Sequence, residues 1–140
     1  MRLARILAVV AVLGGGAVGI VGHAPVYLPT LPVGAPPLPE GPTRVFGYAT
    51  LADPLVRLVV VGRPVRSEGA ALPDWRRVGR DLAPDPGAVT TGRVFEVSPE
   101  GLRRLDRYER AGYRYSRTKK TLADGTQAWV YGLLSPRTAD

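Results

Sequence analysis

Hydrophobic and polar positions divide the chain into an apolar start, a proline-rich middle and an alternating remainder. No charged residue interrupts the run 6–22, and two arginines precede it. A basic start, an apolar run and a small-x-small triplet, here Gly22-His23-Ala24, are typical of a signal peptide. The run also approaches the shortest length that spans a bilayer. We therefore expect residues 1–24 to be a signal peptide or an N-terminal membrane anchor, and the imperfect cleavage site favours the anchor.

The N-terminal pattern also predicts where the rest of the chain lies. Because arginines that flank an apolar segment stay cytoplasmic, we expect the remainder on the extracytoplasmic side, either membrane-anchored or secreted. Residues 25–43 are dense in proline, which predicts an extended, semi-stiff spacer of the polyproline type. Residues 44–140 are then the folded domain.

The first part of this domain alternates in a way that predicts one strand and one helix. Residues 45–51 are expected to form a strand that runs into a loop. Asp53-Pro54 follows as a helix start, with an N-cap residue before a proline at the first helical position. Residues 55–61 continue this helix, and Gly62 is placed to end it.

The second part predicts further strands and another helix. We expect strands at Trp75–Leu82 and Gly92–Val97, with a turn at Pro84–Gly87 between them. Ser98-Pro99 again pairs an N-cap with a proline, and the helix should end between Glu109 and Gly112.

The last part of the domain predicts a hairpin. Residues Tyr113–Leu122 and Gln127–Leu134 flank Asp124-Gly125, a dipeptide that favours a tight turn between two strands. Strands with two short helices make the fold class α+β.

Composition excludes several kinds of chemistry. The chain has no cysteine, and its one histidine, His23, precedes the domain. Disulfides, thiolate nucleophiles, Ser-His-Asp triads and histidine metal sites are therefore excluded from the domain, and we expect neither metal nor cofactor. A formal charge of +7 can attract acidic substrates, anionic lipid or nucleic acid, but solubility together with an arginine-rich composition is the favoured interpretation. Aromatic and basic residues interleave at 107–120, but no nucleic-acid-binding module accompanies them, so no nucleic acid is expected.

Glu109 is the candidate for acid–base chemistry. In a helix, its spacing from Leu102 and Leu105 places the three on one face. A carboxylate on an apolar face is costly unless it is paired, hydrogen-bonded or used. Two interpretations stay open: a catalytic base, or a salt bridge to an arginine such as Arg117. For Asp106, one turn earlier, a cap or an arginine partner is favoured.

Three motifs resemble one known family. They are Tyr48-Ala49-Thr50-Leu51 after the first strand, then Leu105-Asp106-Arg107-Tyr108-Glu109 with Tyr115-Ser116-Arg117, and finally Ala128-Trp129-Val130-Tyr131. In order and spacing, the region from Arg44 to about Leu133 resembles the gamma-glutamylcyclotransferase-like proteins, including the gamma-glutamylamine cyclotransferases. The family usually has glycine at the positions of Ala49 and Arg110.

The resemblance implies a small mixed β-barrel with helices packed around it. It also implies an enzyme whose small-molecule gamma-glutamyl substrate is cleaved by its own α-amine, giving 5-oxoproline and a free amine. Glu109 would be the general acid/base, and the Tyr48–Leu51 loop would bind substrate and stabilise the oxyanion. Tyr115 would line the pocket, and Arg117 would neutralise Glu109 or bind a substrate carboxylate. The alternative is an inactive binding or structural domain on the same fold, tethered to the membrane.

Overall fold

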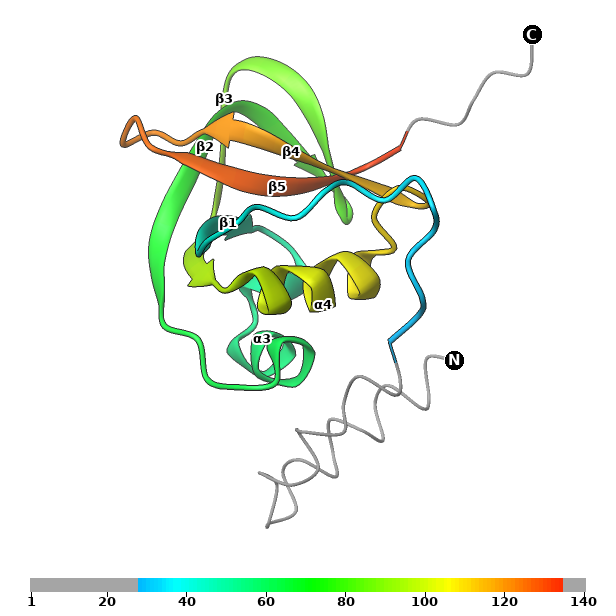
Figure 1. The fold of residues 1–140 in the computed structure, drawn as a ribbon. Helices are drawn as coiled ribbons and strands as arrows, with labels where there is room; N and C mark the ends of the chain where they lie inside the picture. Colours follow the sequence, from blue (N-terminus) through cyan, green and yellow to red (C-terminus); the bar gives the residue numbers. More distant parts are fainter. Residues whose placement is uncertain (1–27, 135–140) are drawn as a thin grey trace, which may run out of the picture.

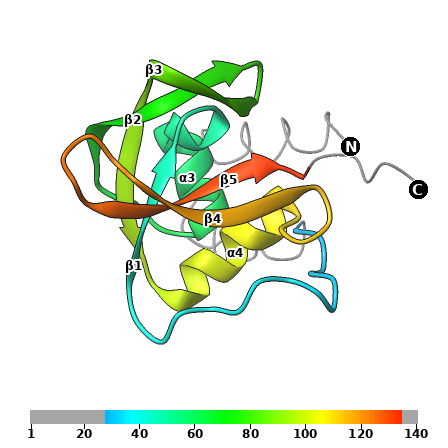
Figure 2. The same ribbon diagram turned by 90° about the horizontal axis from the view of Figure 1, so that it is seen from above.

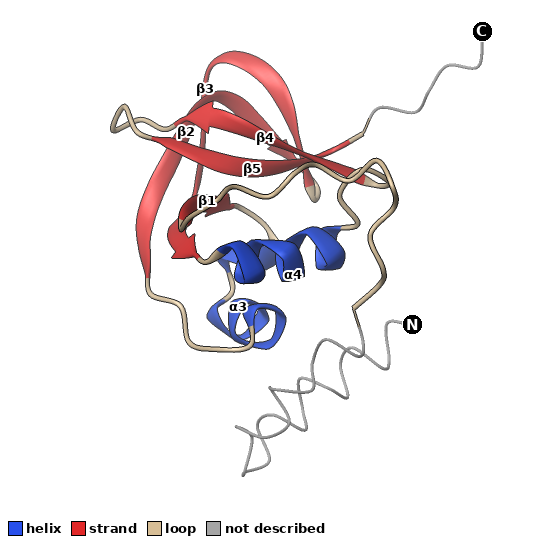
Figure 3. Ribbon diagram, viewed as in Figure 1, coloured by secondary structure: helices blue, strands red, loops and turns tan. Residues whose placement is uncertain are grey.

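The structure is a computed structural model that describes residues 28–134. In chain order, the strands and helices within this range are β1 (Thr43–Gly47), the 3-10 turn η2 (Thr50–Ala52), α3 (Pro54–Val61), β2 (Ser67–Val78), β3 (Asp81–Val97), α4 (Pro99–Glu109), β4 (Tyr115–Thr121) and β5 (Gln127–Leu133). Figure 3 shows both helices on the same side of a curled sheet. The α+β class predicted from the sequence is confirmed.

The strands form one five-stranded sheet in the order β2-β3-β1-β5-β4. β1 is antiparallel to β3 and parallel to β5, while the hairpins β2–β3 and β4–β5 are antiparallel. The expected closed barrel is wrong, because the edge strands β2 and β4 are not paired. On β2, Pro73 lacks an N–H and a register shift follows it, so this edge cannot offer a regular ladder. A backbone hydrogen bond of 2.9 Å from the Ala123 N–H to the Ala71 carbonyl joins the turn after β4 to the edge strand β2.

Local signals account for the helices. The Asp53 side chain accepts a hydrogen bond of 2.8 Å from the Leu55 N–H, and Ser98 accepts one of 3.1 Å from the Gly101 N–H. Both helices begin at the proline after their cap, as the sequence predicts. Gly62, with φ of 86°, ends α3 in the left-handed conformation that favours glycine.

Two core clusters lie on opposite faces of the sheet. Along β1, Val45 faces the helices and packs with Leu102 and Leu105 of α4. Phe46, the next residue, faces the other way and packs with Leu72 of β2 and other residues of that cluster. Because successive side chains of a strand point to opposite faces, β1 is buried on both sides and forms the centre of the domain.

Two predicted boundaries between β2 and β3 are wrong. The expected strand Trp75–Leu82 is divided, since β2 ends at Val78, Gly79 has φ of 61° and β3 begins at Asp81. The expected turn Pro84–Gly87 lies inside β3, where Trp75 pairs with Pro84. Pro84 is tolerated there because β1 pairs only with the C-terminal end of β3. At Pro84 no second strand requires a backbone N–H donor, which proline lacks.

Part of the predicted spacer is docked on the domain. Its described residues run beside α4 in Figures 1 and 2, from blue to cyan. Arg107 donates hydrogen bonds of 2.9 Å to the carbonyls of Leu28 and Pro29, and Arg117 donates one of 2.9 Å to the carbonyl of Pro37. Leu38 packs against the core. The described part of the predicted spacer thus contacts the domain, through arginine side chains that bind the carbonyls of Leu28, Pro29 and Pro37.

The expected signal peptide or anchor, residues 1–24, lies outside the described residues. Within 28–134, neither helix has the length and apolar character needed to cross a membrane.

Candidate active site

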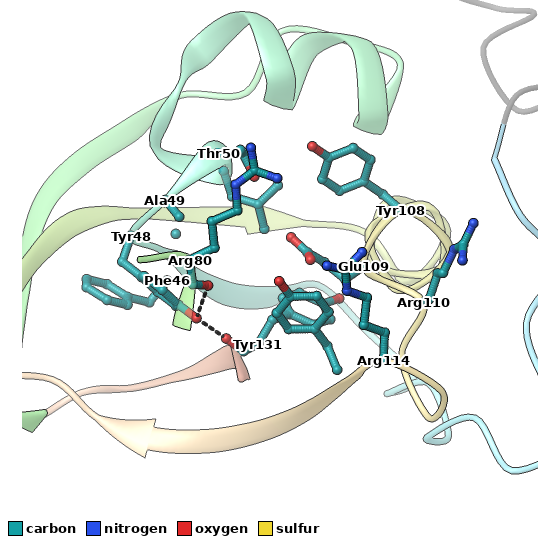
Figure 4. Close-up of a pocket in the computed structure, with 13 residues that line it drawn as sticks. Phe46, Tyr48, Ala49, Thr50, Arg80, Tyr108, Glu109, Arg110, Arg114 and Tyr131 are labelled. Atoms are coloured by element: carbon teal, nitrogen blue, oxygen red, sulfur yellow. Dashed lines mark hydrogen bonds between the residues drawn. The ribbon is translucent and has the colours of Figure 1, made fainter. Parts of the chain in front are cut away.

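A cavity of about 250 Å³ lies between the end of α4 and the loop that follows β1. Figure 4 shows the side chains that surround it. The loop Tyr48–Leu51 forms one wall, Glu109 stands at the end of α4, and Tyr115 comes from the start of β4. The sequence reasoning singled out these residues from distant parts of the chain, and the fold brings them together at one cavity.

The loop after β1 is held tightly from both sides. A Cβ on Gly47 would lie 2.8 Å from the backbone carbon of Leu51, so only glycine fits. The buried Arg57 of α3 donates hydrogen bonds of 2.9 Å to the carbonyls of Leu51 and Ala52. Ala49 has φ of −120°, outside the left-handed region that favours glycine. The loop therefore presents a fixed wall to the cavity.

Tyr48 joins this loop to the last strand. Its hydroxyl donates a hydrogen bond of 2.6 Å to the carbonyl of Tyr131 in β5. Burial raises the pKa of Tyr48 well above its usual value, and the charges of Asp81 and Glu109 add to this effect. Tyr48 therefore stays protonated and acts as a hydrogen-bond donor, not as a base.

Glu109 is the last residue of α4 and is half-buried at the cavity. Leu102 and Leu105 of the same helix are fully buried, as their shared face predicts. The next residue, Arg110, ends the helix with φ of 52°, and Figure 4 draws its guanidinium across the helix from the Glu109 carboxylate. The helix end thus turns the carboxylate toward the cavity.

The charge of Glu109 acts on the tyrosines around it. It contributes to raising the pKa of Tyr115, for which burial is the largest cause. For the buried Tyr131, burial again raises the pKa most, followed by the negative charge of Asp106 and its hydrogen bond, with Glu109 adding to them. The carboxylate of Glu109 therefore shares the cavity with the phenols of Tyr48, Tyr115 and Tyr131, whose raised pKa values keep them protonated.

Asp106, one turn before Glu109, has its own buried partners. Its carboxylate accepts hydrogen bonds from Arg117, with Nε 2.8 Å from Oδ1 and Nη2 3.2 Å from Oδ2. The Tyr131 hydroxyl donates a third, of 2.5 Å, to Oδ1. Burial raises the pKa of Asp106, and the bonds from Tyr131 and Arg117 oppose that rise. The predicted arginine partner of Asp106 is confirmed.

Arg117 is the predicted site residue that the fold keeps away from the cavity. Its guanidinium contacts Asp106 and stacks 4.4 Å from the centre of the Trp129 ring, and it is not part of the cavity wall. A pair between Arg117 and Glu109 is one of the interpretations that the sequence leaves open, and in the structure Arg117 pairs with Asp106. Arg117 pairs with Asp106 because Asp106 is fully buried, and a buried carboxylate is stabilised more by a counter-charge than the half-buried carboxylate of Glu109 is.

Other residues of the wall were missed from the sequence. Arg80 comes from the turn between β2 and β3, which the sequence reading placed inside a strand. Arg114 precedes β4, and Tyr131 comes from β5. Only the Gly79-Arg80 dipeptide carried a local signal, since glycine often marks a turn.

The arrangement suits proton transfer to a bound small molecule. Glu109 is the one carboxylate among the described residues of the cavity wall. A carboxylate beside a bound substrate can take up a proton and return it. Elsewhere in residues 28–134 no three acidic or histidine side chains gather in a way that could hold a metal ion.

Comparisons with known proteins agree with this geometry. The family described as "Gamma-glutamyl cyclotransferase, AIG2-like" matches residues 45–140. No curated protein matches the sequence significantly.

Among solved structures, one from Arabidopsis thaliana is similar with a TM-score of 0.57 and 24% identity, covering 71% of this chain and 72% of that one. A crystal structure of an uncharacterized human protein has a TM-score of 0.56 and 14% identity, covering 69% of each chain. A structure titled gamma-glutamyl cyclotransferase has a TM-score of 0.54 and 14% identity, covering 67% of this chain and 68% of that one. These likenesses show the fold.

Proposed function

Since the chain belongs to the AIG2-like gamma-glutamyl cyclotransferase family, we propose that it releases 5-oxoproline from a gamma-glutamyl amine or peptide. The observation that carries this proposal is the position of Glu109 at the cavity, facing the loop Tyr48–Leu51. The substrate brings its own nucleophile, so the chemistry needs no serine, cysteine or cofactor from the protein.

The proposed reaction is a ring closure. Glu109 takes a proton from the α-ammonium group of the substrate, and the free amine attacks the gamma-carbonyl carbon of the same molecule. A new carbon–nitrogen bond forms the five-membered ring, and negative charge develops on the carbonyl oxygen. Backbone N–H groups of the Tyr48–Leu51 loop stabilise that oxyanion. The old amide bond then breaks as the protonated Glu109 gives its proton to the leaving nitrogen. The ring nitrogen loses its second proton to the regenerated Glu109 carboxylate, from which it passes to the released amine or to water.

The rigidity of the cavity supports this proposal. Ring closure is accelerated when amine and carbonyl are held close together, and a fixed wall does this better than a mobile one. Gly47 and Arg57 hold the loop, while Asp106 and Arg117 hold the end of α4. Tyr115 stays protonated and can donate a hydrogen bond to the substrate.

A direct test is to incubate the full chain with a panel of gamma-glutamyl amines and dipeptides and to detect 5-oxoproline by mass spectrometry. We expect product from at least one member, and Glu109→Gln should lower kcat by about 100-fold or more because it removes the acid/base. Glu100→Gln is the matched control, since Glu100 is an exposed glutamate in the first turn of the same helix.

Two outcomes count against the proposal. Equal turnover by Glu109→Gln would refute the role of this residue. No product from any member, with a folded protein, would favour an inactive binding domain on the same fold. The extracytoplasmic location expected from residues 1–24 stays a separate prediction.

A further inference from the structure

Three arginines of the described chain border the cavity, and Arg110 is set apart from the other two because its guanidinium lies across the helix from the Glu109 carboxylate. The remaining two come from different parts of the chain. Arg80 lies in the β2–β3 turn, and Arg114 lies between α4 and β4. Both are exposed, whereas Tyr48 and Leu51 deeper in the wall are buried. In the view of Figure 4, their side chains extend from two sides, with the Glu109 carboxylate between them. The rim of the cavity is therefore cationic.

Neither arginine has a carboxylate or carbonyl partner among residues 28–134, although Arg114 lies over the Tyr115 ring with its Cζ 5.8 Å from the ring centre, a contact that leaves its N–H groups open to a ligand. Other arginines of the domain have such partners: Arg57 supports the cavity loop, Arg104 donates a hydrogen bond of 3.0 Å to the last carbonyl of α3, and Arg117 pairs with Asp106. By contrast, the side chains of Arg80 and Arg114 donate no hydrogen bond and form no ion pair with any residue of the described range 28–134. Their guanidinium groups are thus available to a ligand.

On the premise of the proposed function, we infer that Arg80 and Arg114 bind a carboxylate on the leaving amine. The preferred substrates are then gamma-glutamyl amino acids and peptides, in place of amines without a carboxylate. Guanidinium groups suit carboxylates because their donors form paired, charge-assisted hydrogen bonds. The same positive charge disfavours a leaving group that carries an ammonium.

A substrate can carry two carboxylates, one on the gamma-glutamyl group and one on the leaving amine, and their positions in the cavity differ. The α-amine of the substrate must lie at Glu109, and its α-carboxylate is attached to the same carbon. Both therefore lie near the half-buried carboxylate and the Tyr48–Leu51 loop. In the ring-closing conformation the leaving nitrogen also lies within reach of Glu109, and the group that it carries extends from there toward solvent. Arg80 and Arg114 are exposed at that outer rim.

The test compares two substrates that differ by one charge, gamma-glutamylglycine and gamma-glutamylglycinamide. For the full chain we expect kcat/KM to favour the acid by about tenfold or more, because a site built for a charged group rejects the neutral analogue. In the Arg80→Gln/Arg114→Gln double variant this ratio should fall to about one. Raising the salt from about 50 mM to about 500 mM should also lower the ratio for the unmodified protein, since exposed charges are screened.

Arg103→Gln is the matched control, because Arg103 is an exposed arginine of α4 whose partner is Glu100 and not the cavity. It should keep the full preference for the acid. A ratio near one in the unmodified protein overturns the inference. So does an equal loss on both substrates in the double variant, which would mean that the arginines bind the gamma-glutamyl carboxylate that both share. If no gamma-glutamyl compound is turned over at all, the proposed function fails, and this inference fails with it.

Discussion

Replacing Arg117 by methionine tests the buried ion pair that anchors the end of α4. The side chains of Arg117 and Asp106 have 0% exposed surface, and Nε lies 2.8 Å from Oδ1. Methionine keeps most of the apolar stem but removes the charge. The variant therefore leaves Asp106 as a buried carboxylate without its counter-charge, which is among the costliest changes a small domain can suffer.

The size of this cost follows from the titration of Asp106. Burial already raises its pKa, and loss of Arg117 removes one of the influences that oppose the rise. In the folded variant, Asp106 can stay protonated, so that no unpaired negative charge is buried. That costs about 1.4 kcal/mol for each pH unit above the unfolded pKa of about 3.9. The free energy of unfolding therefore falls by at most about 4 kcal/mol at pH 7 and about 1.5 kcal/mol at pH 5 through this protonation.

The direction with pH follows from the same linkage. A carboxyl whose pKa is raised by folding contributes stability below its unfolded pKa and loses it as pH rises through the folded pKa. The deficit of Arg117→Met should therefore grow with pH and differ between pH 5 and pH 7 by as much as about 2.7 kcal/mol. The lost hydrogen bond to Pro37 adds about 1 kcal/mol at both pH values.

Urea unfolding followed by circular dichroism at pH 5, 6 and 7 measures this deficit. The double variant Arg117→Met/Asp106→Asn should show a deficit that does not grow with pH, because it has no carboxyl group at position 106 to titrate. Arg103→Met, which breaks only an exposed pair, should cost less than about 0.5 kcal/mol. A deficit for Arg117→Met below about 1 kcal/mol at pH 7, or one independent of pH, would refute the reasoning.

Two further variants probe the backbone around the cavity. Gly47→Ala would place a Cβ 2.8 Å from the backbone carbon of Leu51, so we expect a loss of about 2 kcal/mol and reduced turnover; an unchanged melting temperature would contradict this. Arg110→Gly should stabilise the domain by about 1 kcal/mol in thermal unfolding, because φ of 52° strains any residue but glycine; a lower melting temperature would show that the arginine side chain matters more.

The sequence by itself determined the features that depend on near neighbours. Asp53-Pro54 and Ser98-Pro99 start their helices because an N-cap and a proline act within one turn. Asp124-Gly125 sets the last hairpin for the same reason, with Gly125 at φ of 85°. Helical spacing also placed Glu109 on the side of α4 that meets the cavity. The resemblance to a known family then supplied the rest of the candidate site.

The tertiary structure alone decided how charged groups were paired and how the strands met. From the sequence, Glu109 was a possible partner for Arg117, but in the structure Arg117 pairs with the fully buried Asp106. Arg80 reaches the cavity only because β2 and β3 form a long hairpin whose turn folds toward it. The barrel stays open because its edges lack a regular ladder. These outcomes depend on burial and on distances between residues far apart in the chain, and neither is encoded in local spacing.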